Sequence, residues 1–292
     1  SPRFSATYTL TEKLNLNFNT GRFYQLPSYT TLGFKNNENV LINKSNEVSY
    51  LSADHFLAGF EYAPNINSRV SLEGFVKNYR NYPVSVSDSV ALASKGADYG
   101  IFGNEEVLSA AKGRAYGFEI LARTKDLNGF NLILSYTYVR SEFTGFSDDY
   151  VPSAWDNRHI LNFTLGKKLK RNWDIGMKWR YVGGSPYTPY DLQTSSNRLA
   201  WDARGQGYLD YSLFNTQRFR AFHQLDVRID KTWFLNKWTF QLYMDVQNLY
   251  NFKSQHQDYL TNLSPEGIPQ IDPSNTDNYL LRSISNTAGQ VL

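Results

Sequence analysis

The run Asp156-Asn157-Arg158-His159 offers side chains that metal binding or acid–base catalysis could use. Either chemistry needs further histidines or carboxylates that converge on the same point. The chain has four histidines, and they are spread over different parts of the sequence, at His55, His159, His223 and His256. We therefore interpret the run as polar pairing at a strand end. We expect no catalytic residues, no metal site and no cofactor.

Other charged side chains recur at every second position. Asp226, Arg228 and Asp230 lie two residues apart, so on a strand they share one face and can form a charge ladder. The favoured interpretation is that such residues are solvated and paired across strands, and the alternative is that they guide a ligand. The same holds for Lys77, Lys178 and Arg180.

Aromatic residues gather in a long polar segment, where Tyr187, Tyr190, Trp201 and Tyr208 could stack on a ligand or pack on one another. Packing within the loop is the favoured interpretation. The candidate ligand contacts, taken from the strands and from this segment, are Lys77, Tyr79, Arg180, Tyr187, Tyr190 and Trp201.

Strands must position the charged residues and carry the long segments. From Trp238 to Val246 large apolar residues alternate with polar ones, and this period of two recurs along the chain. The pattern predicts an all-β protein without a helix of useful length. The expected strands are Arg3–Leu10, one from Leu14, Ala53–Tyr62, Arg69–Tyr82 (ended by Pro83), Lys112–Thr124, Phe130–Arg140, Asp156–Lys168, Trp173–Tyr181, Arg218–Trp233 and Lys237–Tyr250.

Tight turns and long polar segments alternate between these strands. Asn128-Gly129, for example, is a strong turn signal. The long segments are about Leu26–Leu51, Val84–Ala111, Ser141–Trp155, Gly183–Gln217 and Asn251–Gln290. Two-faced strands with long loops at one end only are typical of antiparallel outer-membrane β-barrels.

Composition agrees with a barrel. Aromatic residues make up 16% of the 292 residues, yet the mean hydropathy is −0.50. No apolar run reaches the roughly 20 residues that a membrane-spanning helix needs. The net charge of +3 is too small to indicate nucleic-acid binding, and there is no cysteine. We expect an interfacial role for Trp173, Trp179, Trp233 and Trp238.

Counting strands predicts an incomplete barrel. Short turns follow the odd-numbered strands and long loops follow the even-numbered ones, so both chain ends would lie outside the cell. A complete barrel begins and ends in the periplasm, so we expect residues 1–292 to be one partial barrel domain that lacks at least one strand on either side.

Several stretches resemble the C-terminal barrel portion of TonB-dependent outer-membrane receptors. They are Pro152–Asn162, Trp179–Pro189, Leu225–Trp233 and Tyr243–Asn251, and the last of these is the most specific. The resemblance implies about ten strands of a larger, about 22-stranded barrel. The N-terminal plug, the earlier strands and the final strand of that family have no counterpart here. The loops, rich in Asn and Tyr, are similar to those of Bacteroidetes receptors.

The resemblance also implies a function and partners. The chain would supply barrel wall and extracellular loops for active uptake of a siderophore, cobalamin, haem, glycan or peptide, in the outer membrane of a Gram-negative bacterium. Its partners would be outer-membrane lipid, the receptor's own plug, TonB acting through that plug and, in some receptors, a surface lipoprotein. Polar-face residues such as Lys77 could contact the plug.

Two other classes remain open. An outer-membrane protease or lipase on a ten-stranded barrel needs its Asp, Ser and His groups at one rim, whereas the four histidines here are dispersed. A soluble glycan-binding β-sandwich needs polar residues on its outside, whereas the apolar face here recurs as a band.

Overall fold

The computed structural model describes residues 1–95 and 103–289, in which the long strands form one antiparallel sheet of eleven strands. The strands follow their order in the sequence, and the short β7 pairs with β6 beside this path. Their bounds are β1 Arg3–Thr11, β2 Leu14–Gln25, β3 Leu51–Asn65, β4 Ser68–Ser85, β5 Val107–Leu127, β6 Phe130–Phe143, β7 Val151–Pro152, β8 Arg158–Leu169, β9 Trp173–Val182, β14 Phe222–Phe234 and β15 Thr239–Val246. The predicted all-β class and antiparallel sheet are confirmed.

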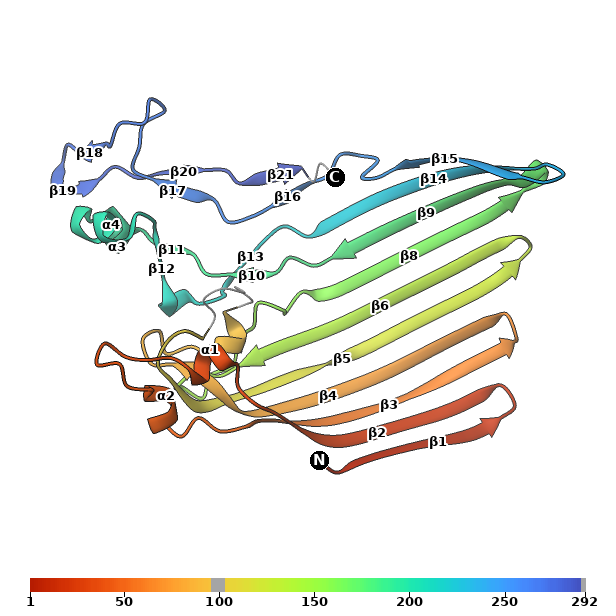
Figure 1. Cartoon of the computed structure of the whole chain (residues 1–292), viewed down its shortest axis with the longest axis horizontal. Helices are drawn as coiled ribbons and strands as arrows, with labels where there is room; N and C mark the ends of the chain where they lie inside the picture. The colour runs from red at the N-terminus through yellow and green to blue at the C-terminus, as the bar shows by residue number, and fades with distance from the viewer. Residues whose placement is uncertain (96–102, 290–292) are drawn as a thin grey trace.

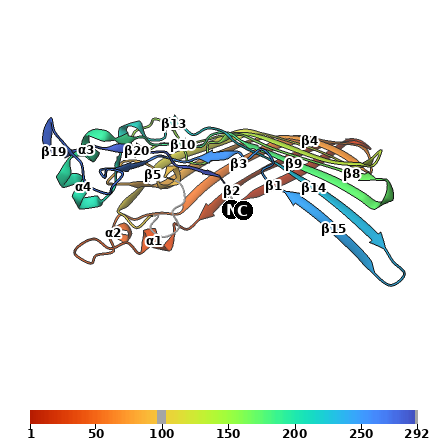
Figure 2. The ribbon, with the colours of Figure 1, turned by 90° about the horizontal axis from the view of Figure 1, so that it is seen from above.

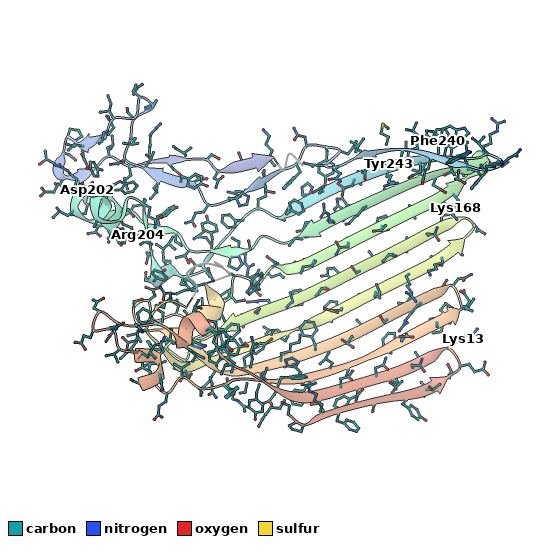
Figure 3. The ribbon with its side chains drawn as sticks, viewed as in Figure 1. Lys13, Lys168, Asp202, Arg204, Phe240 and Tyr243 are labelled. Atoms are coloured by element: carbon teal, nitrogen blue, oxygen red, sulfur yellow. The ribbon has the colours of Figure 1, made fainter. Side chains whose placement is uncertain are left out.

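The connections between the strands differ at the two ends of the sheet. Figure 1 shows every tight turn at one end and the long loops at the other. Lys13 and Lys168 mark the turn end in Figure 3, and Asp202 and Arg204 mark the loop end. In the view from above, the edge strands β1 and β15 both lie below β4, so the sheet is arched (Figure 2).

The two faces of the sheet differ in chemistry, as the alternation predicts. Phe240, Leu242 and Met244 on β15 are 57%, 59% and 60% exposed, so they do not belong to a compact core. Gln241 on the same strand points to the opposite face, where its side chain bonds Asp230 of β14 at 3.0 Å. We call these the apolar face and the polar face.

β4 continues past Pro83, so the expectation that this proline ends the strand is wrong. The register shifts at Tyr79/Tyr82 and again at Tyr82/Pro83, after which Pro83 pairs with Ser109. Irregular pairing of this kind accommodates a residue that cannot donate a backbone hydrogen bond. β5 is accordingly longer than predicted and begins at Val107.

Short elements occupy the long loops. The helices are α1 Tyr29–Leu32, α2 Ile42–Ser45, α3 Leu192–Ser196 and α4 Arg198–Arg204, with 3₁₀ turns at Leu92–Ser94 and Tyr211–Leu213. A further 3₁₀ turn, Lys170–Asn172, forms the tight connection between β8 and β9. None of the helices in the described residues is long and apolar enough to cross a membrane. β10 (Pro186–Tyr187) pairs with β13 (Gln217–Arg218), and β11 (Tyr190–Asp191) pairs with β12 (Tyr208–Leu209).

The segment after β15 forms a long ribbon, although its sequence shows no periodicity. Successive pairs β16–β21, β17–β20 and β18–β19 fold it back on itself. Their bounds are β16 Lys253–Gln255, β17 Tyr259–Thr261, β18 Ile271–Asp272, β19 Asn275–Tyr279, β20 Arg282–Ile284 and β21 Thr287–Gly289.

Buried apolar residues gather at the loop end of the sheet. Val84, Ala91, Ala111 and Phe143 pack together there, with Tyr79 against them. Trp173 and Trp233 lie near the turn end, and Trp238 lies in the turn between β14 and β15. Trp179 lies further along β9.

Candidate functional site

Three long loops meet above the sheet around a cavity of about 420 Å³. Their described residues are 86–95 with 103–106, 144–157 and 183–221. Carboxylates, hydroxyls and aromatic rings line the cavity, among them Asp88, Ser94, Phe143, Tyr150, Tyr211 and Phe214. Ser94 Oγ is buried and finds no partner among the described residues. A buried polar group without a partner is costly, so Ser94 is an unfavourable feature of this loop junction.

Asn215 holds the three loops together. It is 6% exposed, and its Nδ2 donates to the carbonyl oxygen of Ser94 at 3.0 Å and to that of Pro152 at 2.8 Å. Its backbone N–H donates to Thr188 Oγ1 at 3.0 Å. One side chain thus ties two loops to a third.

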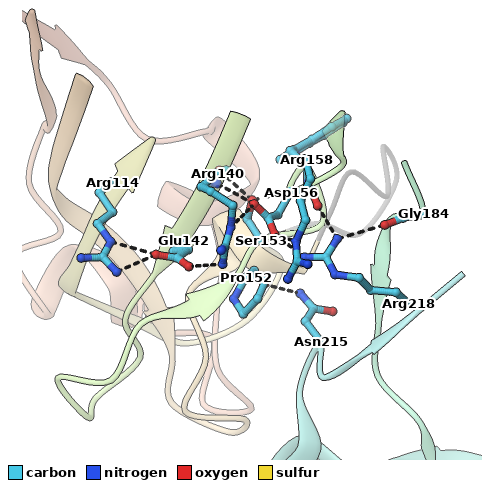
Figure 4. Close-up of polar contacts among 12 residues, drawn as sticks. Arg114, Arg140, Glu142, Pro152, Ser153, Asp156, Arg158, Gly184, Asn215 and Arg218 are labelled. Atoms are coloured by element: carbon cyan, nitrogen blue, oxygen red, sulfur yellow. Dashed lines mark hydrogen bonds and ion pairs between the residues drawn. The ribbon is translucent and has the colours of Figure 1, made fainter. Parts of the chain in front are cut away.

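A network of arginines and carboxylates lies beside this junction (Figure 4). Asp156 is fully buried, and its Oδ1 accepts from Arg140 Nε at 3.1 Å and from the Ser141 N–H at 2.9 Å. Its Oδ2 accepts from Arg218, which also donates to the Gly184 carbonyl at 3.0 Å. Arg158 Nε lies 3.8 Å from the same carboxylate.

The network continues across β5 and β6 through Glu142, which pairs with Arg140 and, at 2.7 Å, with Arg114. The interpretation of Asp156–His159 as polar pairing at a strand end describes these contacts. The sequence pattern did not indicate that Arg218, far along the chain, joins them.

One lysine beside the cavity pairs with two carboxylates. Lys95 Nζ lies 2.5 Å from Asp88 and 2.9 Å from Glu105. Burial acts to lower the pKa of Lys95, but its hydrogen bonds to the two carboxylates outweigh burial and raise that pKa above 10.5. Burial, together with nearby Asp88, raises the pKa of Tyr211. Both side chains are therefore protonated near neutral pH.

A second cavity of about 330 Å³ contains two of the predicted ligand contacts. Tyr187 and Tyr190 line it with Phe219, His256 and Asp258. The Tyr187 and Phe219 rings stack with centroids 4.2 Å apart. Burial, and then Tyr259 and Asp258, raise the pKa of Tyr190, so its hydroxyl remains a hydrogen-bond donor.

The other predicted contacts lie elsewhere. Trp201 is buried inside its own loop at 6% exposure, on α4. Tyr79 lies on the polar face of β4 and stacks on Phe143, 5.4 Å away, which lines the first cavity. Lys77 is on the same face two residues earlier, and Arg180 on β9 lies 3.5 Å from Asp226. The six residues therefore do not form a single site.

The predicted charge ladder is present on the polar face of β14. Arg228 donates to Asp230 at 2.6 Å, and Gln224 donates to Asp226 at 2.6 Å. Lys178 and Arg228 line a shallow pocket here together with Asp226.

Residues 1–95 and 103–289 contain no group of three or more His, Asp or Glu side chains that could hold a metal ion. Among the histidines, the His159 ring nitrogen lies 2.9 Å from the Tyr136 hydroxyl, and that of His223 lies 2.8 Å from Tyr250. These are pairs rather than the convergent sets that catalysis needs.

Comparisons with known proteins agree on the fold. The family model "TonB dependent receptor-like, beta-barrel" matches residues 1–282. No curated protein sequence matches the chain.

Three solved structures illustrate the similarity. The ferric citrate transporter FecA is 15% identical with a TM-score of 0.62, over 99% of this chain and 36% of that one. The ferric-catecholate import receptor Fiu from E. coli K12 is 17% identical with a TM-score of 0.58, over 91% of this chain and 32% of that one. The ferripyoverdine receptor of Pseudomonas aeruginosa is 15% identical with a TM-score of 0.59, over 92% and 31%. The chain thus spans about a third of the length of these proteins.

Proposed function

Because this chain belongs to the TonB-dependent receptor-like β-barrel family of the Gram-negative outer membrane, we propose that it supplies barrel wall and outer loops for active uptake of a small ligand. The family consists of receptors and transporters, so the enzyme alternative is set aside. The apolar face of the sheet is exposed, whereas a soluble β-sandwich needs polar residues on its outside.

The main support for the proposal is that apolar and polar side chains lie on opposite faces of the sheet. The apolar face suits lipid and the polar face suits a water-filled lumen. The loops at one end enclose two cavities, where a ligand arriving from outside would be held. The plug that completes such a receptor, the remaining strands and the contact of the plug with TonB would be supplied outside residues 1–292.

The proposed ligand class is a ferric chelate. Support comes from similar solved structures, among them the ferric citrate transporter FecA, the ferric-catecholate import receptor Fiu and the ferripyoverdine receptor. The aromatic rings and hydroxyls of the two cavities suit the ring systems and oxygen atoms of such chelates.

Growth under iron limitation tests this ligand class. A strain without the gene should fail to grow when one ferric chelate is the sole iron source, and the wild-type gene should restore growth. Tyr190→Ala should lower uptake of that chelate, since Tyr190 lines the second cavity. Tyr29→Ala is the control, because Tyr29 is 85% exposed and lines neither cavity. Normal growth of the deletion strain on every chelate would reject iron uptake.

A glycan is the second candidate ligand, because the side chains that line the first cavity suit sugars. Tyr150, Tyr211 and Phe214 offer flat rings there, and Asp88 and Asp149 offer acceptors for sugar hydroxyls. Loss of growth on a single polysaccharide, with normal growth on all iron sources, would favour the glycan over the chelate.

A further inference from the structure

The ribbon begins where β15 ends, and one asparagine shapes that junction. β15 pairs with β14 only as far as Val246, the register partner of Val227. Asn248 follows with a φ of 51°, a left-handed conformation that asparagine adopts more readily than most residues. Its backbone N–H donates to Asp226 Oδ1 at 2.9 Å, so the chain stays attached to β14 just past the last paired residues.

The side chain of Asn248 binds both backbone groups of a single residue further along the chain. Its Oδ1 accepts from the Phe252 N–H at 2.8 Å, and its Nδ2 donates to the Phe252 carbonyl oxygen at 3.0 Å. The amide thus takes the place of a paired strand residue. Residues 249–251 are closed into a small loop, and the direction in which the chain leaves Phe252 is fixed.

Phe252 is in turn held against the start of β14. Its ring centroid lies 4.2 Å from that of His223. The guanidinium of Arg220 lies 5.1 Å from the same ring, and its Nη2 donates to the Lys253 carbonyl oxygen at 2.6 Å. The Arg220 backbone N–H donates to Gln255 Oε1 at 3.1 Å. The first strand of the ribbon, β16, therefore starts from a defined position.

The second cavity follows directly on this anchored stretch. Figure 1 shows the ribbon running from the end of β15 towards α3 and α4. The ribbon contributes His256, Gln257 and Asp258 to the cavity wall, and the loop between β9 and β14 contributes Tyr187 and Tyr190. Gln257 Nε2 also donates to a main-chain carbonyl oxygen of that loop at 2.8 Å. A shift at the base of the ribbon would therefore move one wall of the cavity against the other.

We propose that Asn248 is a positioning residue for the second cavity. Its two bonds to Phe252 fix where the ribbon leaves β15, and this sets the separation between the ribbon and the loop that face each other across the cavity. Asn248 does not line the cavity, so it acts through the ribbon and not by contact with a ligand. The inference rests on the proposed function in one respect, that a ligand is held in this cavity.

Three variants separate the side-chain bonds of Asn248 from its backbone conformation. Asn248→Ala removes both bonds to Phe252 and adds strain, because alanine disfavours a positive φ. Asn248→Gly removes the same bonds without the strain, so it should behave like Asn248→Ala. Asn251→Ala is the matched control: Asn251 has a φ of 52°, but its side chain bonds none of the described residues.

A distance measurement tests the position of the ribbon without any ligand. Residues 1–292 contain no cysteine, so Lys253→Cys on the ribbon and Leu199→Cys on α4 can carry spin labels once any cysteine elsewhere in the full-length protein is replaced. Double electron–electron resonance should give the same narrow distance distribution with and without Asn251→Ala, and a broader or shifted one with either Asn248 variant. An unchanged distribution in both Asn248 variants would overturn the proposal.

Uptake kinetics test the effect on the ligand. The probe is the ferric chelate that supports growth, labelled with radioactive iron. Either Asn248 variant should raise its half-saturation concentration about tenfold, the effect of roughly one lost hydrogen bond, and leave the maximal rate unchanged. A lower maximal rate with an unchanged half-saturation concentration would show that Asn248 affects only folding, and would reject a positioning role. If no chelate depends on the protein, the proposed iron uptake fails, whereas the distance measurement still decides whether Asn248 fixes the ribbon.

Discussion

At the scale of single residues, buried polar side chains organise the loop end of the molecule. Asp156 has no exposed surface and receives three arginines, while Asn215 bonds two carbonyl groups from different loops. A buried carboxylate of this kind is stable only while its partners remain, because an unpaired charge away from water is costly.

Removing the buried carboxylate should therefore destabilise the protein. We expect Asp156→Ala to lower the free energy of unfolding by about 3 kcal/mol, since Arg140 and Arg218 lose their shared partner. Asp148→Ala should change it by less than about 1 kcal/mol, because that carboxylate and its partner Lys112 are both exposed. Urea unfolding in lipid vesicles measures both, and equal effects would disprove a special role for Asp156.

The second prediction concerns Lys95 and alkaline pH. Its folded-state pKa is raised, so its stabilising effect is complete below the ordinary value of 10.5 and is lost as the pH rises through the folded value. The difference in melting temperature between the wild type and Lys95→Met should stay constant from about pH 8 and shrink above about pH 10.5. A difference that is unchanged at high pH would show that Lys95 does not act through its charge.

At the scale of elements, the strands could be predicted because lipid and water impose a strict period of two. Every one of the ten predicted strands is present, with ends shifted by a few residues. The ends could not be predicted where irregular pairing intervenes, as it does at Pro83. The ribbon after β15 could not be predicted either, because its short strands pair without an apolar pattern.

Neighbouring residues of β8 test the two faces directly. Leu165 pairs with Leu132 and Met177 on the apolar face, whereas Thr164 lines a pocket on the polar face with Lys178 and Asp226. Leu165→Arg should destabilise the barrel by about 2–4 kcal/mol if it lies at the bilayer midplane, and Thr164→Arg much less. Heat-modifiable gel migration with urea unfolding would measure this. The reverse order would mean that the faces are assigned the wrong way round.

At the scale of the whole molecule, the loops act as one assembly above the arched sheet. Sequence reasoning placed Tyr187 and Tyr190 in a loop but could not show that they share a cavity with His256. It missed Ser94 and Asn215 altogether, because an isolated serine or asparagine in a polar loop carries no periodic signal. Contacts between loops depend on the three-dimensional arrangement of the strands that carry them.

Removing the Asn215 side chain should increase the motion of all three loops together. Asn215→Ala removes bonds to both Ser94 and Pro152, so amide hydrogen exchange should accelerate in residues 86–94, 144–157 and 183–221 together. The central strands should keep their protection. Asn67→Ala, in an exposed turn at the opposite end of the sheet, is the control. Faster exchange confined to residues near 215 would show that the loops are independent.

The strand order of the sheet has a consequence for how the protein reaches its final form. Each long strand pairs with the strands that come just before and after it among the sheet strands. Pairing can therefore proceed between neighbours in the sequence: the hairpins joined by tight turns form over short loop closures, and the long loops then join one hairpin to the next. A defect in one strand would then halt pairing at that strand while the hairpins already formed remain intact.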